Sequence, residues 1–288
     1  MGFRCARTVS FGPAVVLLLA SFPLAGAGAD SAPGIPASQL VREVIQNEVH
    51  SAEADHTRWM YRLHHRDPHT DEVKECVDSR EVTICRVLAR NGHPLPPEEA
   101  QREIQHIDAL ARNPQKLKEQ QKSRQQDGDR ALKMLKMLPD AFNYEYEGRE
   151  AEYLRLRFEP NPKFKPPDRE SRVFHAMVGS LVIDPESKRL VAIQGRLVKD
   201  VDFGLGLLGH LNKGGTFEVR REQVGDGVWE TTLLDVNVHG RAMFFKTINA
   251  QQHEVTEDFK EVPPNLTLAH AASMLEAPSL QARSEKAH

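Results

Sequence analysis

The segment from residue 171 to residue 262 most constrains the fold, because its apolar runs are separated by very short turns. Asp184-Pro-Glu-Ser-Lys188 places Pro and Ser where a turn needs a fixed φ and a local hydrogen bond, and Val224-Gly-Asp-Gly-Val228 supplies the positive-φ positions of a tight hairpin. Strands joined by such turns must be antiparallel, because a parallel return needs a crossover of about a dozen residues. We therefore predict a meander of six strands: Val173–Ile183, Leu190–Val201, Gly215–Val224, Val228–Val238, Arg241–Asn249 and His253–Val262.

Apolar residues on both faces of the first of these strands predict that the sheet is covered. Because side chains alternate along a strand, Val178 and Val182 point to one face and Leu181 points to the other. A sheet with one solvated face would alternate more cleanly, so a second element must lie on it. Residues 38–54 predict an amphipathic helix for this role, with Ser38 as its N-cap. Its apolar positions recur every three or four residues: Leu40, Val41, Val44, Ile45 and Val49.

A long helical segment interrupts the strands. It covers residues 95–138, pauses at Asn113-Pro114, and is almost wholly polar over residues 115–130, which is typical of a solvated helix or of an arm that docks a partner. A short helix over residues 268–275 is followed by a tail, residues 277–288, that we expect to be disordered. The remaining predicted strands are Thr57–His65, Glu72–Val77, Val82–Arg90, Asn143–Glu147 and Tyr153–Glu159.

The first 29 residues have the three parts of a secretory signal. Arg4 and Arg7 form a charged start, residues 11–24 form an apolar run, and residues 25–29 are small, as a cleavage site requires. The apolar run is short for a bilayer span, which disfavours the alternative of an uncleaved anchor. We therefore expect a cleaved signal peptide, a Pro/Gly/Ala linker over residues 30–37, and a location in the periplasm or outside the cell.

Cys76 and Cys85 are the two cysteines that remain once Cys5 leaves with the signal. An even pair in an oxidising compartment predicts a disulfide. The residues between them centre on Asp78-Ser-Arg-Glu81, which is typical of a hairpin turn and would place the two sulfur atoms on facing strands. The spacing is not C-x-x-C, so we expect a structural bridge and not a redox-active one.

Composition and motifs argue against several classes of function. A formal net charge of -3 and a pI near 6.5 produce no field that would attract phosphate backbones, so we do not expect nucleic acid as a partner. No serine stands in a G-x-S-x-G motif, and both remaining cysteines are paired. His64, His65 and His69 cluster, but adjacent strand residues point to opposite faces, which disfavours metal binding. We predict no catalytic residues, no metal and no cofactor.

Gly204-Leu-Gly-Leu-Leu-Gly209 matches the G-x-G-x-x-G pattern of dinucleotide-binding loops. That motif needs a parallel βαβ unit, whereas the next predicted element here is another antiparallel strand. We therefore interpret the segment as an apolar loop. Its leucines would be costly to expose, so the loop either tucks over the end of the sheet or forms a gate or a lip that touches a membrane.

Three strand segments carry a resemblance to a known superfamily: Leu190-Val-Ala-Ile-Gln-Gly-Arg196, Gly240-Arg-Ala-Met-Phe-Phe-Lys246 and Asp258-Phe259. With the order of elements, they resemble the outer-membrane lipoprotein-sorting and periplasmic lipoprotein-carrier superfamily. The resemblance implies an α+β fold, in which a strongly curved antiparallel sheet forms a half-barrel of about eleven strands with helices on its concave side. It implies a single domain over residues 38–276, in which the charged helical segment 95–138 is an insertion.

The same resemblance implies a cavity on the concave side that binds a hydrophobic ligand without covalent chemistry. A filled core is the alternative. The residues that we expect to line the cavity or form its gate are Phe174, Met177, Phe203, Leu205, Leu207, Leu208, Leu211 and Phe244.

The leading hypothesis is a non-enzymatic carrier, monomeric and in transient contact with a membrane, that binds a lipid or a lipoprotein acyl chain. A second hypothesis is a protein-interaction module that docks an envelope partner through the charged helix 114–138. A third is an unrecognised hydrolase with dispersed residues, for which His175, Asp202, His210 and His239 are the candidates.

Overall fold

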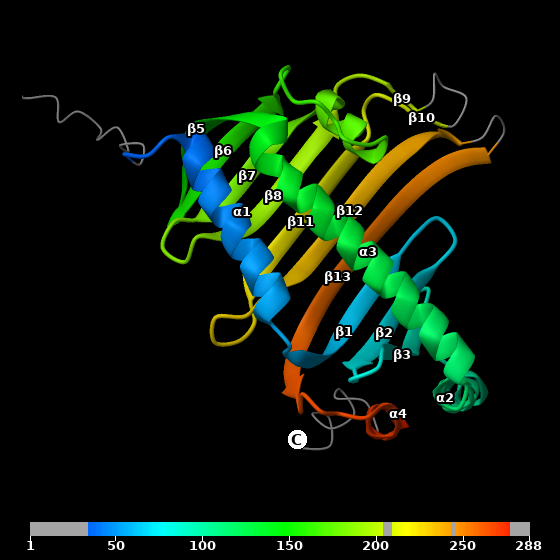
Figure 1. The fold of residues 1–288 in the computed structure, drawn as a ribbon. Coiled ribbons are helices and arrows are strands. Elements are labelled where there is room, and N and C mark those ends of the chain that lie inside the picture. Colours follow the sequence, from blue (N-terminus) through cyan, green and yellow to red (C-terminus); the bar gives the residue numbers. More distant parts are fainter. Residues whose placement is uncertain (1–33, 204–208, 243–245, 277–288) are drawn as a thin grey trace, which may run out of the picture. The chain divides into compact units, whose positions relative to one another are not determined.

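The computed structural model describes residues 34–203, 209–242 and 246–276 (Figure 1). Within these ranges the chain is an α+β protein, in which one large antiparallel sheet is accompanied by four α-helices and one 3-10 helix. The predicted signal peptide over residues 1–29 and the predicted tail over residues 277–288 lie outside the described residues.

The sheet follows a path of eleven strands in the order β4-β3-β2-β1-β13-β12-β11-β8-β7-β6-β5. Off this path, β10 pairs with β12, and β9 pairs with β10. Because β13 pairs with both β12 and β1, this last strand joins the first three strands to the meander. The edges β4 and β5 do not pair, so the sheet is open, and the predicted curved half-barrel class is confirmed. The strands are β1 Arg58–Arg66, β2 Asp71–Asp78, β3 Thr83–Arg90, β4 His93–Pro94, β5 Phe142–Glu150, β6 Tyr153–Pro160, β7 Met177–Asp184, β8 Arg189–Leu197, β9 Val201–Phe203, β10 Gly209–Leu211, β11 Thr216–Gln223, β12 Trp229–Ala242 and β13 Lys246–Val262.

Two helices lie over one face of the sheet, α1 over its β5–β8 end and α3 across its width (Figure 1). The C-terminal turns of α3 pack beside α1, and buried residues of both helices share the main core with β5, β6, β7 and β8. The helices are α1 Ala37–Ala54, α2 Pro97–Ala111, α3 Pro114–Ala141, the 3-10 helix η1 Glu170–Ala176, and α4 Leu268–Glu276.

The pairing register identifies the side chains on the face beneath α1 and α3, called the concave face from here on. Leu181 of β7 lies in the main core, and residues directly opposite one another across paired strands share its face. From Leu181 this row runs through Ile193, Val219, Leu234, Glu254 and His65. Because side chains alternate along β1, Tyr61 and Leu63 are also on the concave face, and Met60 is on the outer face.

A second core lies on the outer face at the β1–β3 end. Met60, Val77 and Ile84 are on that face, and they are buried with Ala271 and Leu275 of α4. Helix α2 contributes to the same core and packs on β3 and α4. Not all helices therefore lie on the concave side, because alternation places the most apolar residues of the first three strands on the opposite face.

The first predicted strand of the meander is wrong over its first four residues. It starts at Met177, and Glu170–Ala176 form η1 instead. The carboxylate of Asp168 accepts hydrogen bonds from the backbone N–H and the hydroxyl of Ser171, both at 2.8 Å. These local bonds stabilise a turn at the expense of the extended chain, and His175 consequently lies in a helix and not in a strand.

Two further boundaries also differ from the prediction. Of the predicted strand Arg241–Asn249, Arg241 and Ala242 end β12, and residues 246–249 belong with His253–Val262 to one strand, β13. Ala250, Gln251 and Gln252 continue the pairing of β13 with β12, because no Gly or Pro interrupts the ladder there. Helix α1 begins before Ser38, since the carbonyl of Pro36 accepts from the backbone N–H groups of Gln39 and Leu40.

The predicted disulfide is confirmed. Cys76 and Cys85 lie directly opposite one another on β2 and β3 and are bonded. The turn between them is closed by the backbone N–H and the hydroxyl of Ser79, which donate to the carbonyl of Val82 at 2.9 and 2.6 Å.

A buried ionic network attaches α1 to the sheet. Glu48 of α1 is 3% exposed, and its carboxylate accepts two hydrogen bonds from Arg189 at 2.9 and 3.1 Å and one from the backbone N–H of Leu190 at 2.8 Å. Arg221 of β11 donates to the same carboxylate. Removing Glu48 would leave two guanidinium groups without their shared counter-charge, which is costly in a buried site.

We predict that Glu48→Leu lowers the free energy of unfolding by about 3–5 kcal/mol, the range found when one partner of a buried ion pair is removed. Urea denaturation followed by circular dichroism measures the change. Glu53→Gln is the matched control on the same helix, because Glu53 is exposed and its pair with Lys136 lies on the surface. An equal loss in both variants would show that the buried network does not hold α1.

Candidate ligand-binding face beneath helix α3

The concave face beneath α1 is a filled core. Gly179 and Gly195 lie opposite one another on β7 and β8, and an aromatic ring occupies the space above each of them. A Cβ atom on Gly179 would come within 2.7 Å of the Phe158 ring, and one on Gly195 within 2.7 Å of the Phe217 ring. The glycines therefore allow the two strands to lie close together and two phenyl rings to pack against the backbone, so side chains fill the face at these positions.

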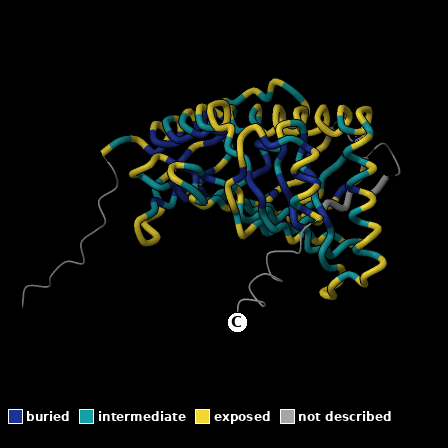
Figure 2. Tube along the Cα trace, turned by 90° about the horizontal axis from the view of Figure 1, so that it is seen from below, coloured by how far each residue is buried: buried dark blue, intermediate teal, exposed yellow. Residues whose placement is uncertain are grey.

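The middle of α3 is exposed to solvent, whereas both of its ends pack against a core. Leu117 packs against the outer-face core, and Leu135 and Leu138 pack in the main core. Between these anchors, residues 118–131 are all exposed, and the burial colouring in Figure 2 shows yellow turns along the helical layer. Fourteen consecutive exposed residues cover every side of a helix, so even the side toward the sheet is solvated. We call residues 118–131 the bridging segment.

The bridging segment crosses the sheet near β12, β13 and β1 (Figure 1), and the register of these strands places apolar side chains on their concave face. Apart from Trp59, which is buried, they are only partly buried, and none belongs to either core. Three of them form an aromatic row: Trp59, Tyr61 and Phe259. The ring of Phe259 stacks on Tyr61 with 5.7 Å between the ring centroids, and it packs edge-on against the buried Trp59 with 5.9 Å between the centroids. We define the open concave face by Tyr61, Leu63, Leu234, Val236 and Phe259.

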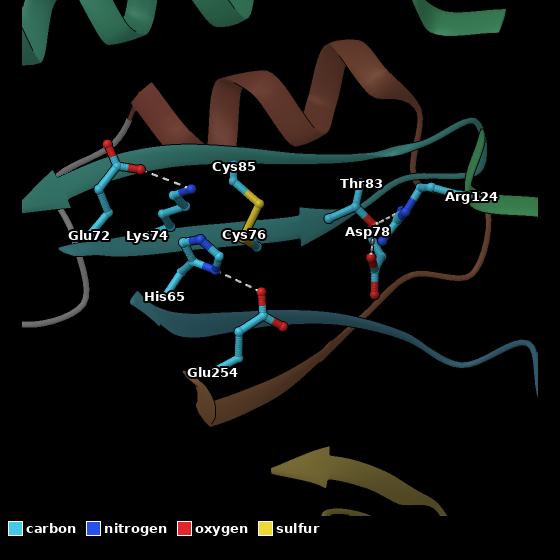
Figure 3. Close-up of a disulfide and its surroundings, with 9 residues drawn as sticks. All are labelled: His65, Glu72, Lys74, Cys76, Asp78, Thr83, Cys85, Arg124 and Glu254. Carbon is cyan, nitrogen blue, oxygen red and sulfur yellow. Dashed lines mark hydrogen bonds and ion pairs between the residues drawn. A yellow bond between two sulfur atoms is a disulfide. The ribbon is translucent and has the colours of Figure 1, made fainter. Parts of the chain in front are cut away.

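One side chain of the bridging segment reaches the sheet in the described structure. Arg124 donates to the hydroxyl of Thr83, which in turn donates to Asp78 (Figure 3). Tyr61 lies beside this group, and its burial, reinforced by the Asp78 carboxylate, raises its pKa to about 12. Arg124 is therefore the contact that connects the middle of α3 to the aromatic row.

Polar pairs and the disulfide occupy the rest of the same face. His65 and Glu254 lie 2.8 Å apart, and Lys74 and Glu72 lie 2.9 Å apart, and both pairs are on the same face as the Cys76–Cys85 bridge (Figure 3). His64 points to the outer face, where it contacts Glu257 at 3.1 Å. The two neighbouring histidines are thus separated by the sheet, as predicted from strand alternation. Within the described residues, no group of three or more His, Cys, Asp or Glu side chains is placed to hold a metal ion.

The predicted cavity residues fall into two groups. Phe174 and Met177 are 3% and 9% exposed in the main core, and Leu211 packs partly against it, so these three do not line the open concave face. The backbone of Phe203 belongs to β9. Its side chain and the remaining predicted residues lie outside the described part of the chain: Leu205, Leu207, Leu208 and Phe244.

The strands around the G-x-G-x-x-G segment are described although its centre is not. Val201–Phe203 and Gly209–Leu211 pair antiparallel, and His210 contacts Asp202 at 2.8 Å across them. The predicted antiparallel strand after this segment is thus present, in place of the helix of a βαβ unit. The backbone of His239, another candidate base, accepts from Asn212 at 2.8 Å, and its side chain is exposed.

A polar pocket of about 490 Å³ lies at the C-terminal end of α1, beside the turn between β11 and β12. Arg189, Arg221 and Glu230 are among the residues that line it. The sequence analysis did not predict this pocket. Glu48, which binds its two arginines, could have indicated it: Glu48 stands four residues after Val44 on the apolar stripe of α1, where an acidic residue needs a buried partner. No comparable signal marks Glu230.

Glu230 is a titratable group in this pocket. Its carboxylate accepts a hydrogen bond from Trp59 Nε1 at 3.0 Å. Burial raises the pKa of Glu230 above its ordinary value, and this effect outweighs the attraction of Arg221. The folded protein therefore binds a proton at this position more tightly than the unfolded chain does.

We predict that Glu230→Gln stabilises the protein at neutral pH. A raised folded-state pKa adds stability below the unfolded pKa of about 4.3, and that contribution is lost as the pH rises through the folded pKa. Glutamine keeps an acceptor for Trp59 but does not ionise. The melting temperature of the variant should therefore exceed that of the native protein by an amount that grows between pH 4 and pH 8. A constant difference over this range would contradict the assignment.

Comparison with known proteins returned no match to any family model, curated protein or solved structure. In the described part of the chain, no helix combines the length and apolar character that crossing a membrane requires.

Proposed function

We propose that this protein is a non-enzymatic carrier that binds a hydrophobic ligand, a lipid or a lipoprotein acyl chain, on the open concave face beneath the bridging segment. The observation that supports this most is the contrast between the two parts of the concave face. Beneath α1 the face is filled by buried side chains, whereas beneath the bridging segment apolar side chains stay partly exposed and an entire helix segment remains solvated.

Physical reasoning supports a bound chain at this position. Fully burying an exposed large apolar side chain gains about 1.5–3 kcal/mol, and the partly exposed residues under the helix gain a part of this when something apolar covers them. The bridging segment contributes no apolar side chain that could do so, since it consists of polar and charged residues with Ala131 and Gly128. An acyl chain between the helix and the sheet would supply the missing cover and would leave the charged residues of α3 in water.

The carrier proposal includes the predicted location and state. We propose a protein exported by a cleaved signal over residues 1–29, acting as a monomer in the periplasm or outside the cell, with transient membrane contact through the apolar loop around residues 204–209. Native mass spectrometry with solvent extraction, on protein purified without detergent, would identify a stoichiometric bound lipid.

We predict that Leu234→Gln weakens the binding of a fluorescent fatty acid by about tenfold or more, because it removes one apolar side chain from the contact. Leu233→Gln is the matched control. Leu233 is the next residue on β12, is equally partly buried, and lies on the outer face opposite Val255. Fluorescence titration of both variants against the native protein measures the effect.

If the ligand binds on the open concave face, the Leu234 variant must bind the fatty acid more weakly than the Leu233 variant. Equal affinity in both variants, or no saturable binding by the native protein, would contradict the proposal.

The exposed surface of α3 favours a second candidate, a protein-interaction module. Lys118 and Lys122 lie in the exposed bridging segment and make no ion pair within the described residues. Replacing both with Gln should abolish partner capture and leave fatty-acid binding intact if α3 docks an envelope protein. Unchanged partner capture by the double variant would contradict docking through α3.

A further inference from the structure

The polar pocket at the end of α1 is lined by charged groups of both signs. Two guanidinium groups, of Arg189 and Arg221, and three carboxylates, of Asp55, Asp226 and Glu230, line its volume of about 490 Å³. The carboxylate that holds the arginines to α1 is Glu48, so the three lining carboxylates are not needed for that attachment. A pocket with charges of both signs is suited to a ligand that also carries both.

The two arginines that line the pocket have hydrogen-bond donors that no residue uses. Arg189 is 7% exposed, its Nε and Nη2 donate to Glu48, and its guanidinium lies 5.8 Å from the centre of the Trp229 ring. Within the described residues, Nη1 of Arg189 makes no hydrogen bond. It is not fully buried either, because Nε of Arg86 is the only fully buried side-chain nitrogen or oxygen there that lacks a hydrogen-bond partner. Nη1 of Arg189 is therefore open to the pocket that this residue lines. With Arg221 it places two guanidinium groups beside Glu48, and the N–H donors that Glu48 does not occupy suit the oxygens of an anion.

The carboxylates of the pocket favour a cation. Asp55 and Asp226 are exposed, and Glu230 is partly buried. Ser51 and Ala54, in the last turn of α1, also line the pocket. The C-terminal end of a helix carries a partial negative charge, which adds to the carboxylates and stabilises a positive group.

Glu230 also connects the pocket to the open concave face. It accepts the hydrogen bond from Trp59, whose ring packs against Phe259, and Phe259 stacks on Tyr61. The aromatic row thus runs from the pocket wall to the open concave face. An elongated ligand could place a polar head in the pocket and an apolar chain along this row.

We propose that the pocket binds a zwitterionic aminophosphate group, with its phosphate on Arg189 and Arg221 and its ammonium on Asp55, Asp226 and the end of α1. In its full form this inference rests on the proposed carrier function: the group is then the head of an amphiphile whose acyl chain lies on the open concave face. The same chemistry also exists in free phosphoethanolamine, which the pocket alone would bind.

Isothermal titration calorimetry on the full chain tests this with three probes: lysophosphatidylethanolamine, lysophosphatidylglycerol of the same chain length, and free phosphoethanolamine. We expect the ethanolamine lipid to bind about tenfold more tightly than the glycerol lipid, because only its head carries the ammonium. The double variant Asp55→Asn, Asp226→Asn should reduce this ratio to about one. It should leave the affinity for the glycerol lipid unchanged. Asparagine at position 55 can still accept the hydrogen bond from the backbone N–H of Thr57. Glu222→Gln is the control that should keep the ratio, because Glu222 is an exposed carboxylate on β11 outside the pocket.

The outcomes separate this inference from the carrier proposal. Equal affinity for the two lipids, or a preference that survives in the double variant, overturns the headgroup site while the carrier stands. Binding of phosphoethanolamine alone, lost in the double variant, supports the aminophosphate site and overturns the carrier. Absence of binding by all three probes overturns both. A melting temperature within a few degrees of the native value confirms that the double variant is folded.

Discussion

The pairing of β1 with β13 is the interaction on which the rest of this structure depends. It runs from Arg58 opposite Val262 to Arg66 opposite His253, and it places the strands before the helical segment beside the last strand of the chain. The strands on either side of that segment, β4 and β5, consequently lie at opposite edges of the sheet. Ten strand spacings of about 4.8 Å separate those edges by about 48 Å along the sheet. The 28-residue α3, about 42 Å long at 1.5 Å per residue, is a helix of the length that the crossing needs.

This crossing explains why a polar helix lies across a partly apolar face. A helix that connects two edges is held at its ends, by Leu117 in one core and by Leu138 in the other, and its middle need not pack on anything. The sheet itself is stabilised elsewhere, by α1 on one face and by α2 and α4 on the opposite face. The strands between the two cores are therefore free to present apolar side chains to a ligand, which is the basis of the carrier proposal.

Ionic contacts add a second level of organisation. Glu48 binds Arg189 and Arg221 in a buried network that fixes the C-terminal half of α1, and the same arginines line the pocket at its end. Glu48 thus attaches α1 to the sheet and also holds the two arginines at the pocket. Its carboxylate occupies only part of their hydrogen-bonding capacity, so the remaining N–H groups can bind a ligand. In the proposed carrier, the end of α1 is then both a structural anchor and the contact for a polar head.

The sequence by itself determined the elements with strong local signals. The turns around Asp184 and Gly225, the alternation along the meander, the apolar stripe of α1 and the facing cysteines all depend on residues close together in the chain, and each is present in the structure. Tertiary structure decided the features that depend on distant partners. The merging of two predicted strands into β13, the outer-face position of α4, the buried role of Glu48 and the pocket around Glu230 arise only when segments far apart in the chain meet. Local patterns carry no information about such partners, and this is why Phe174 and Met177, predicted from the resemblance to line a cavity, lie in the filled core while the open concave face lies elsewhere on the same sheet.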